Sequence, residues 1–206
     1  MNVKELIFAS RNAGKIAEIK DMLSPLGIEV KSALDLDLPD VEENGATFAE
    51  NSLLKSQTIA HYTGLPCIAD DSGLCVEALG GGPGVYTARY APNRDFDKGM
   101  DKLLTEMKNS PIKSRKAWFC CVLSLAFPNG RYELFEGRVD GTIAEKKSGT
   151  TGFGFDPLFI PDGYTCSFAQ MNKEEKNAIS HRGRAMKKFQ NFLQHLKGAD
   201  ELEQSF

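Results

Sequence analysis

A short apolar run, Pro66–Ala69, ends abruptly in Asp70-Asp71-Ser72-Gly73. The run predicts a buried strand that delivers two adjacent carboxylates to a turn. Because neighbouring side chains of a strand point to opposite faces, one Asp would face an open cleft and the other the scaffold. Two like charges this close are costly unless a donor, a proton or a cation such as Mg²⁺ offsets them. The alternative is an ordinary polar turn capped by Asp and Ser.

Helical and strand patterns alternate around this run. Leu6–Ala9 reads as a first strand, and a helical pattern follows it until Gly27. Thr47–Glu50 forms a capping box that opens a second helix, which Gly64 closes. This alternation predicts an α/β protein.

The second half of the chain adds a hairpin to the alternation. Ala117–Phe127 is a long apolar strand, and Asn129-Gly130 is the strongest short hairpin signal in the sequence. A last helical region is expected over roughly residues 172–196. One hairpin among alternating helices and strands predicts a mixed sheet, not a purely parallel one.

Length, charge and cysteine usage limit the class of protein. The 206 residues suit one domain, which we place at residues 1–198, followed by a polar C-terminal tail at 199–206. The net charge of −3 gives no general attraction to nucleic acid or an anionic membrane, and no stretch is apolar enough to span a bilayer. Five cysteines without a C-x-x-C pair, and a start without a signal-peptide pattern, favour a reducing cytoplasmic location.

A candidate phosphate-binding turn follows the first strand. It consists of Ser10, Arg11, Asn12, Ala13, Gly14 and Lys15. A strand, a turn of small residues and a Lys that opens a helix would present backbone N–H groups and a cation to an anion. The turn is not a Walker A loop, because Ala9 replaces its first glycine and Ile16 follows the Lys. The alternative is an ordinary helix start with a surface Lys.

A second acidic turn, Glu42–Gly45, is a candidate source of a further metal ligand once it is considered together with Asp70 and Asp71. A cation that bridges a triphosphate usually takes only one or two protein carboxylates, and Glu43 with Asp71 would suffice. In isolation the turn reads as a solvated loop.

Two later segments suggest recognition of a planar base. In Gly152–Pro157, Phe153 or Phe155 could stack on a ring while Asp156 accepts from a ring N–H. His181 and Arg182 could both donate to a carbonyl or a phosphate. The alternatives are a glycine-rich turn with core aromatics and a solvated helix face.

The ordered set of motifs resembles the inosine-triphosphate pyrophosphatase family, which hydrolyses non-standard purine nucleoside triphosphates. The matching segments lie at residues 9–15, 42–51, 69–74, 80–90, 152–157 and 174–183. They run nearly end to end in the family order. The resemblance implies an elongated mixed sheet flanked by helices, with two lobes and a central cleft, and an active homodimer. It also implies hydrolysis of ITP, dITP or XTP to a monophosphate and pyrophosphate with Mg²⁺.

Family roles transfer to the matching positions. By this resemblance Asp71 is the proton acceptor and a metal ligand, Glu43 is the second metal ligand, and Ser72 contacts the substrate. Residues 10–15 would bind the phosphates. The nucleotide would be recognised by Phe153, Gly154, Phe155, Asp156, Lys176, His181 and Arg182.

The sequence departs from the family pattern at two positions. Arg11 stands where the family usually has Gly, and we expect its side chain to point to solvent. Phe155 replaces the usual Tyr, which removes a hydroxyl and keeps a flat ring.

Three other functions compete with this prediction. A related pyrophosphatase could act on pyrimidine or modified nucleotides, and a catalytically silent module could bind a nucleotide without cleaving it. A P-loop ATPase is disfavoured by the missing Walker pattern.

Overall fold

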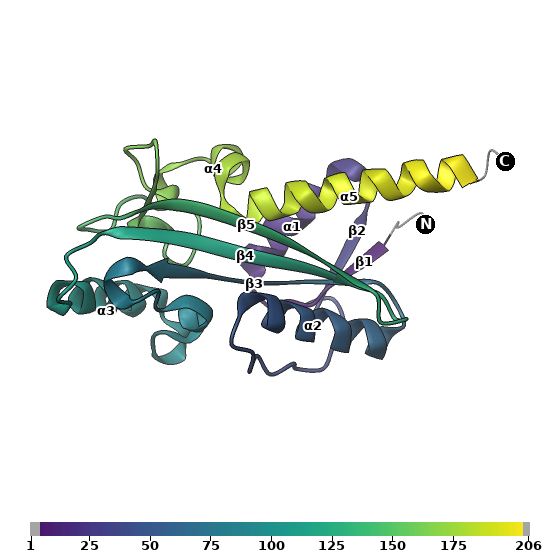
Figure 1. Ribbon diagram of the computed structural model, residues 1–206, viewed down its shortest axis with the longest axis horizontal. Coiled ribbons are helices and arrows are strands. Elements are labelled where there is room, and N and C mark those ends of the chain that lie inside the picture. The colour runs from purple at the N-terminus through teal and green to yellow at the C-terminus, as the bar shows by residue number, and fades with distance from the viewer. Residues whose placement is uncertain (1–4, 204–206) are drawn as a thin grey trace. The chain divides into compact units, whose positions relative to one another are not determined.

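The computed structural model describes residues 5–203, except for the side chains of Pro92 and residues 197–203. It shows an α/β fold with a six-stranded mixed sheet in the order β2-β1-β3-β4-β5-β6 (Figure 1). The strands are β1 (Glu5–Phe8), β2 (Glu29–Ser32), β3 (Cys67–Val76), β4 (Lys116–Ala126), β5 (Tyr132–Ile143) and β6 (Phe159–Pro161). Strand β1 pairs in parallel with β2 and β3, whereas β5 and β6 are antiparallel. The predicted mixed α/β fold is confirmed.

The helices are α1 (Ala13–Leu23), α2 (Phe48–Thr63), α3 (Phe96–Asn109), α4 (Lys173–Ile179) and α5 (His181–Glu203). The chain divides into two compact units. Unit 1 comprises residues 1–71, 122–136 and 185–206, and unit 2 comprises residues 72–121 and 137–184. Strands β3, β4 and β5 each pass from one unit into the other. The predicted domain limits of 1–198 and 199–206 stay a prediction.

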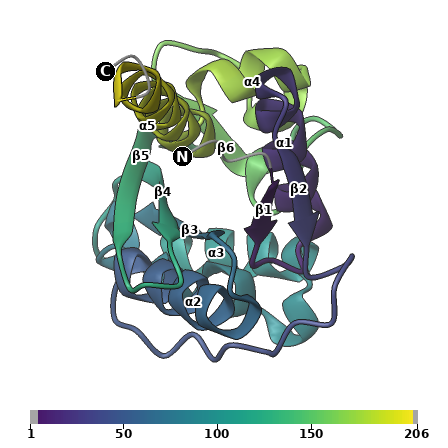
Figure 2. The same cartoon turned by 90° about the vertical axis from the view of Figure 1, so that its right-hand side faces the viewer.

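In unit 1, α2 lies on one face of the strands, and α1 and α5 lie on the other (Figures 1 and 2). Ile59 and Ala60 of α2 join an apolar cluster with Ile7, Cys67 and Ala126 from three strands. On the opposite face, Phe135 packs against two aromatic rings of α5, each with a centroid separation of 5.4 Å. Burial of apolar surface on both faces explains why the unit-1 part of β3 is buried throughout.

In unit 2, α3 and α4 lie on opposite sides of the strands (Figure 1). The core contains Leu74 and Val76 of β3, Met100 and Leu103 of α3, and a group of phenylalanines. Within this group, Phe119 and Phe159 pack edge to face at 4.8 Å. This core fixes the glycine-rich segment 152–157 through Phe155, which is 1% exposed.

Local sequence signals explain most helix ends. Thr47 and Glu50 form the predicted reciprocal capping box, and Gly64 ends α2 in the left-handed conformation. Gly130 has a φ of +88° in the predicted hairpin turn between β4 and β5. Gly27 has a φ of +68°, although it follows a short 3₁₀ turn after α1.

Two local predictions are wrong. Asp70 and Asp71 do not lie in a turn, because β3 continues through them to Val76 and buries both of its faces. The helical region expected over residues 172–196 is two helices, since Ser180 has an extended backbone with ψ of 159°. Helix α5 runs on to Glu203, so it includes part of the expected polar tail; residues 204–206 lie outside the described residues.

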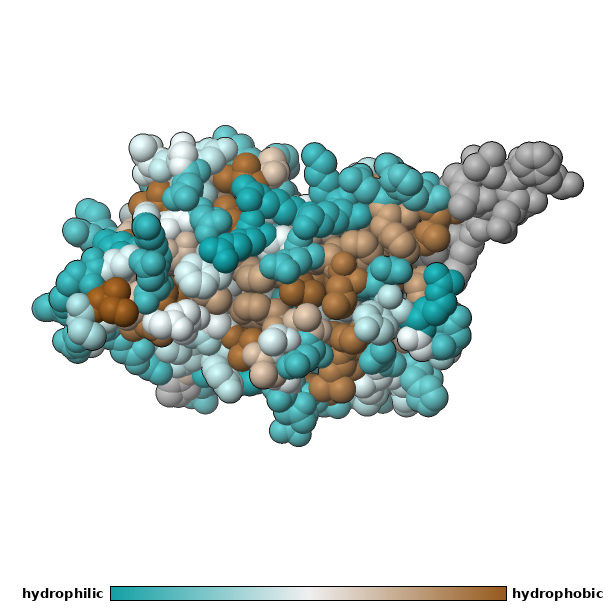
Figure 3. Space-filling model, in the orientation of Figure 1, coloured by the Kyte–Doolittle hydropathy of each residue, from teal (hydrophilic) through white to brown (hydrophobic). Residues whose placement is uncertain are grey.

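No helix in the described part of the chain is long and apolar enough to cross a membrane. On the face shown in Figure 3, apolar side chains gather beside the long strands, and polar side chains cover most of the remaining surface.

The carboxylate of Asp35 gives the fold a specific acid sensitivity. It accepts from the backbone N–H and the hydroxyl of Ser32, both at 2.8 Å, and these bonds with Lys20 lower its pKa to about 2. A depressed pKa stabilises the fold above the ordinary carboxyl pKa of about 4, and this stabilisation is lost as the pH falls toward 2. We therefore expect Asp35→Asn to be less stable than the wild type in denaturant at pH 7. The difference should shrink as the pH falls from about 4 toward 2 and vanish only below pH 2, and a difference independent of pH would contradict this cause.

Candidate functional site

The phosphate-binding turn has the conformation of a capped helix start. Asn12 is the N-cap of α1, and its side-chain oxygen accepts from the Lys15 backbone N–H at 3.1 Å. The Asn12 N–H in turn donates to Ser10 Oγ at 3.2 Å. These bonds fix a tight turn at the positive end of the helix dipole, where anions are favoured.

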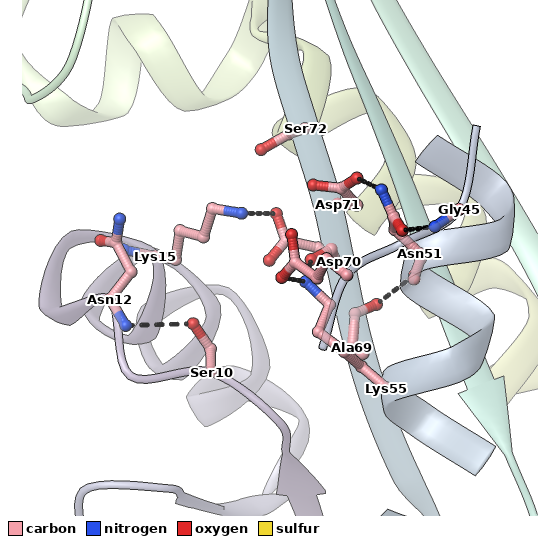
Figure 4. A network of polar contacts seen from close by, with 12 residues as sticks. Ser10, Asn12, Lys15, Gly45, Asn51, Lys55, Ala69, Asp70, Asp71 and Ser72 are labelled. Atoms are coloured by element: carbon pink, nitrogen blue, oxygen red, sulfur yellow. Dashed lines mark hydrogen bonds and ion pairs between the residues drawn. The ribbon is translucent and has the colours of Figure 1, made fainter. Parts of the chain in front are cut away.

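Asp70 and Asp71 lie on β3 with their carboxylates directed to different partners (Figure 4). Asp70 Oδ2 lies 3.1 Å from Lys15 Nζ of α1, and Asp71 Oδ2 accepts from Asn51 Nδ2 of α2 at 3.0 Å. Both residues are buried, at 1% and 5% exposure. The expected alternation of the two side chains is therefore present, and each carboxylate has its own polar partner.

Lys55 of α2 joins two of the acidic segments. Its Nζ lies 2.6 Å from Glu43 Oε1. The same ammonium group donates to the Asp70 backbone carbonyl at 2.7 Å (Figure 4). Only 11% of the Lys55 side chain is exposed. A buried ammonium thus offsets part of the negative charge that Glu43 and the two aspartates bring together.

The electrostatics of Asp71 follow from burial. Loss of solvent raises the pKa of its carboxyl above the ordinary value, and the charge of Glu43 raises it further. Lys55, Lys15 and the hydrogen bond from Asn51 act in the opposite direction. A raised pKa makes Asp71 a better proton acceptor than an exposed Asp, since basicity increases with pKa.

Unit 2 holds the residues predicted to bind the base. Asp156 Oδ2 accepts from Lys176 Nζ at 2.7 Å and from the Phe153 backbone N–H at 2.8 Å. Lys176 Nζ also lies 4.6 Å from the centroid of the Phe153 ring. A Cβ at Gly152 would come within 2.2 Å of Asp156 Oδ2, so this turn requires glycine.

His181 and Arg182 begin α5, directly after the break at Ser180. The His181 ring stacks on Phe119 with centroids 4.7 Å apart and planes 11° apart. Arg182 is 2% exposed, and its Nη2 donates to Ser72 Oγ at 2.9 Å. The two donors are therefore held in fixed positions by β4 and β3 within unit 2.

Comparison with known proteins identifies the family. The Ham1 family model matches residues 6–192. The chain belongs to the Ham1 family. The resemblance expected from its motifs is confirmed.

Curated relatives of this Ham1-family chain cover nearly its whole length. A protein of Rhizobium meliloti named dITP/XTP pyrophosphatase is 47% identical over 201 residues, which are 90% of this chain and 94% of the relative. A Bacillus licheniformis protein of the same name is 45% identical, over 93% of this chain and 98% of its own. The solved structure of a Staphylococcus aureus Ham1 protein has a TM-score of 0.83 at 42% identity and covers 93% of this chain and 99% of its own.

The structure places the sequence-predicted residues of this Ham1-family chain in two sets. The first set lies in unit 1 and contains residues 10–15, Glu43 and Asp71. The second lies in unit 2 and contains Ser72, Phe153, Gly154, Phe155, Asp156, Lys176, His181 and Arg182. Asp71 and Ser72 are consecutive residues of β3, so one peptide bond joins the two sets.

The side chains of Phe155 and Arg11, two of the predicted contact residues, are engaged by other parts of the protein. The Phe155 ring is buried against Tyr90 and Phe96, as in the alternative of a core aromatic. Phe153 is partly exposed and offers more ring surface. The Arg11 side chain is 55% exposed; its Nη2 donates to the Leu38 carbonyl at 2.9 Å and its Nε lies 3.0 Å from Asp40 Oδ1. Arg11 thus ties the turn to residues 38–40.

The sequence alone assigns no role to Lys55 or to Asn51, although Asn51 ends the matching segment 42–51. Both lie on the face of α2 that also bears Ser52 and Ser56, at spacings of one, four and five residues. Such a polar stripe usually faces solvent. The capping box fixes the start of the helix, but only the packing of α2 on β3 reveals that this stripe is buried.

The raised pKa of Asp71 predicts that Asp71→Asn stabilises the metal-free protein at neutral pH. A carboxyl whose pKa is higher in the folded state destabilises the fold increasingly as the pH rises above the ordinary carboxyl pKa of about 4, and fully above the folded-state pKa. Below the ordinary pKa it has no such effect. Thermal unfolding with a chelator present should give a higher Tm for the variant at pH 7 and equal Tm values at the acid end. A lower Tm for the variant at pH 7 would contradict this electrostatic account.

Proposed function

We propose that this chain hydrolyses non-standard purine nucleoside triphosphates, ITP, dITP and XTP, to the monophosphate and pyrophosphate. The observation that supports the proposal best is the buried carboxylate of Asp71. Beside it, the ammonium group of Lys15 contacts the Asp70 carboxylate, and that of Lys55 contacts the Asp70 backbone carbonyl. Relatives named dITP/XTP pyrophosphatase, at 44–47% identity over most of the chain, support the substrate class.

Asp71 would accept the proton of the attacking water. The water oxygen would form a bond to the α-phosphorus. The bond between that phosphorus and the oxygen that bridges it to the β-phosphorus would break, and the pyrophosphate that leaves would keep the electron pair of this bond. The proton passes to the Asp71 carboxylate, whose pKa burial has raised. Positioning and charge neutralisation dominate such phosphoryl chemistry, and Lys15 with the start of α1 would hold the phosphate oxygens.

Mg²⁺ is the proposed cofactor, with Glu43 and Asp71 as its protein ligands. The donor chemistry fits: the oxygens of both residues are hard ligands, and Glu43 lies near enough to raise the pKa of Asp71. Among the described residues no three or more His, Cys, Asp or Glu side chains converge as a metal site. Two carboxylates suit an ion that takes its remaining ligands from substrate phosphates and water. When bound, Mg²⁺ would neutralise charge on the phosphates.

Selectivity for the base would depend on hydrogen-bond matching in unit 2. Hypoxanthine and xanthine present a 6-keto acceptor, whereas adenine presents a 6-amino donor. Donors from His181 and Arg182 would satisfy the keto oxygen and leave an amino group unmatched. A site built to bond one group rejects the mismatched one strongly, because its buried donors are then unpaired.

Further parts of the proposal concern the setting of the enzyme. We place it in the cytoplasm as a homodimer that acts on a small-molecule substrate and binds neither nucleic acid nor membrane. The net charge of −3 supports the absence of a polyanion-binding surface, and the cysteines without a C-x-x-C pair support a reducing compartment.

Asp71→Asn should abolish most turnover while keeping the fold. Loss of the proton acceptor should lower kcat by about 10²–10⁴-fold, the range typical of a general base. A panel of ITP, XTP, GTP, ATP and a pyrimidine triphosphate, with and without Mg²⁺, should be assayed for pyrophosphate separately from phosphate. Asp37→Asn, an exposed carboxylate in the same unit, is the control. Near-normal turnover of Asp71→Asn would exclude the assignment, and release of phosphate instead of pyrophosphate would exclude the reaction.

His181→Ala should weaken the preference for 6-keto purines. We expect kcat/KM for ITP to fall at least about tenfold, or about 1.4 kcal/mol of transition-state binding, with a smaller change for ATP. His195→Ala, an exposed histidine on the same helix, serves as the matched control. Equal losses for ITP and ATP would show that His181 does not read the 6-position.

A further inference from the structure

The side chain of Asn51 connects two segments that bear the proposed catalytic carboxylates. Asn51 lies in the first turns of α2 and is 0% exposed. Its Nδ2 donates to Asp71 Oδ2 at 3.0 Å, and its Oδ1 accepts from the Gly45 backbone N–H at 2.8 Å (Figure 4). Gly45 stands two residues after Glu43, so one amide group spans the distance from the Glu43 segment to Asp71.

The chemistry of these partners determines which residue can occupy position 51. The Gly45 N–H is only a donor, so the amide oxygen must face it, and the amide nitrogen then faces the Asp71 carboxylate. An Asp at position 51 would have the same shape as Asn but no N–H donor, and would place a second negative charge beside the Asp71 carboxylate. An apolar residue would leave both partners without this bond. A buried polar group that loses its partner bears the full cost of its desolvation.

The segment before α2 is held close enough to make this bond specific. A Cβ at Gly45 would come within 2.8 Å of Asn51 Oδ1 and 2.8 Å of Glu50 Cβ. Glu50 Oε2 also accepts from the Ala46 and Thr47 N–H groups, at 2.7 and 3.1 Å. The capping box and Asn51 therefore hold the same segment from two sides.

We propose that Asn51 is a positioning residue that fixes the Asp71 carboxylate and the Glu43 segment in one arrangement. This inference rests on the proposed function, because it explains how the two carboxylates are kept ready for the reaction. The amide reaches Asp71 and Gly45 with its two ends, so the role is exerted through these residues and not on the substrate.

The test compares two substitutions that separate the two ends of the amide. Asn51→Ala removes both bonds, whereas Asn51→Asp keeps an acceptor for Gly45 and loses the donor to Asp71. Ser56→Ala is the matched control. Ser56 is equally buried on the same helix and bonds to the Leu53 carbonyl and to Ser124 Oγ. Each variant is assayed for kcat and KM with ITP at saturating Mg²⁺, for thermal unfolding, and for hydrogen exchange of the Gly45 amide by NMR.

The proposal predicts a different pattern for each variant. Asn51→Ala should lower kcat at least tenfold with KM within about threefold, and should speed exchange of the Gly45 amide at least tenfold. Asn51→Asp should lower kcat as strongly while the Gly45 amide stays protected. Ser56→Ala should keep kcat within twofold and leave the Gly45 amide protected.

Two results would overturn the proposal: a kcat within twofold of the wild type in folded Asn51→Ala, or an equally protected Gly45 amide in that variant. If the Asn51 variants do not fold, Gly45→Ala disturbs the same hydrogen bond from its other end, because the added Cβ would collide with Asn51 Oδ1. An unchanged kcat in that variant would also overturn the proposal. Absence of pyrophosphate release by the wild type would instead refute the proposed function, while the Gly45 exchange data still decide whether Asn51 holds the segment.

Discussion

The packing of α2 against β3 is the constraint on which the acidic part of the site depends. Three α2 residues contact three consecutive β3 residues: Asn51 bonds to Asp71, Ser52 Oγ lies 3.0 Å from the Ala69 carbonyl, and Lys55 bonds to the Asp70 carbonyl. Ser52 Oγ also lies 2.8 Å from Ser124 Oγ of β4. Because these side chains bond to backbone or to buried carboxylates, a shift of α2 along β3 would break several bonds at once. Helix position and carboxylate position are thus coupled.

Burial of two adjacent carboxylates opposes folding, and the structure offsets this cost locally. Asp70 has Lys15, Glu43 has Lys55, and Asp71 has the amide of Asn51, a neutral donor. Burial raises the pKa of the Asp71 carboxyl above its ordinary value, and the charges of Lys55 and Lys15 and the hydrogen bond from Asn51 oppose this rise only in part. A carboxylate that is poorly compensated in the folded state is also the better base. In the proposed role of Asp71 as proton acceptor, stability and reactivity would therefore conflict at this residue, as is common at functional sites.

The sequence predicted the elements better than the way they pack. The capping box at Thr47, the hairpin at Asn129-Gly130 and the glycines that end helices are local signals, and they appear where expected. The turn expected at Asp70-Asp71 is wrong because long-range burial, not local propensity, extends β3 to Val76. Asn51 ends the matching segment 42–51, but the sequence assigns no role to it or to Lys55, because a polar stripe on a helix gives no sign of being buried. The assignment of the predicted residues to two units likewise depends on contacts between distant segments.

The residues proposed to bind the base follow the same physical principle as the acidic residues. Lys176 and Asp156 form a buried ion pair, and Arg182 donates to Ser72 within unit 2. Removal of one partner from a buried ion pair leaves the other charge uncompensated. The fold then loses far more stability than it would on the breaking of an exposed ion pair. The donors are consequently held in place before a ligand arrives. In the proposed recognition of a keto oxygen these donors would need little reorganisation, whereas an amino group would meet donors that cannot move away. The break at Ser180 is what allows this, because it starts α5 at His181 and directs two successive side chains to β4 and β3.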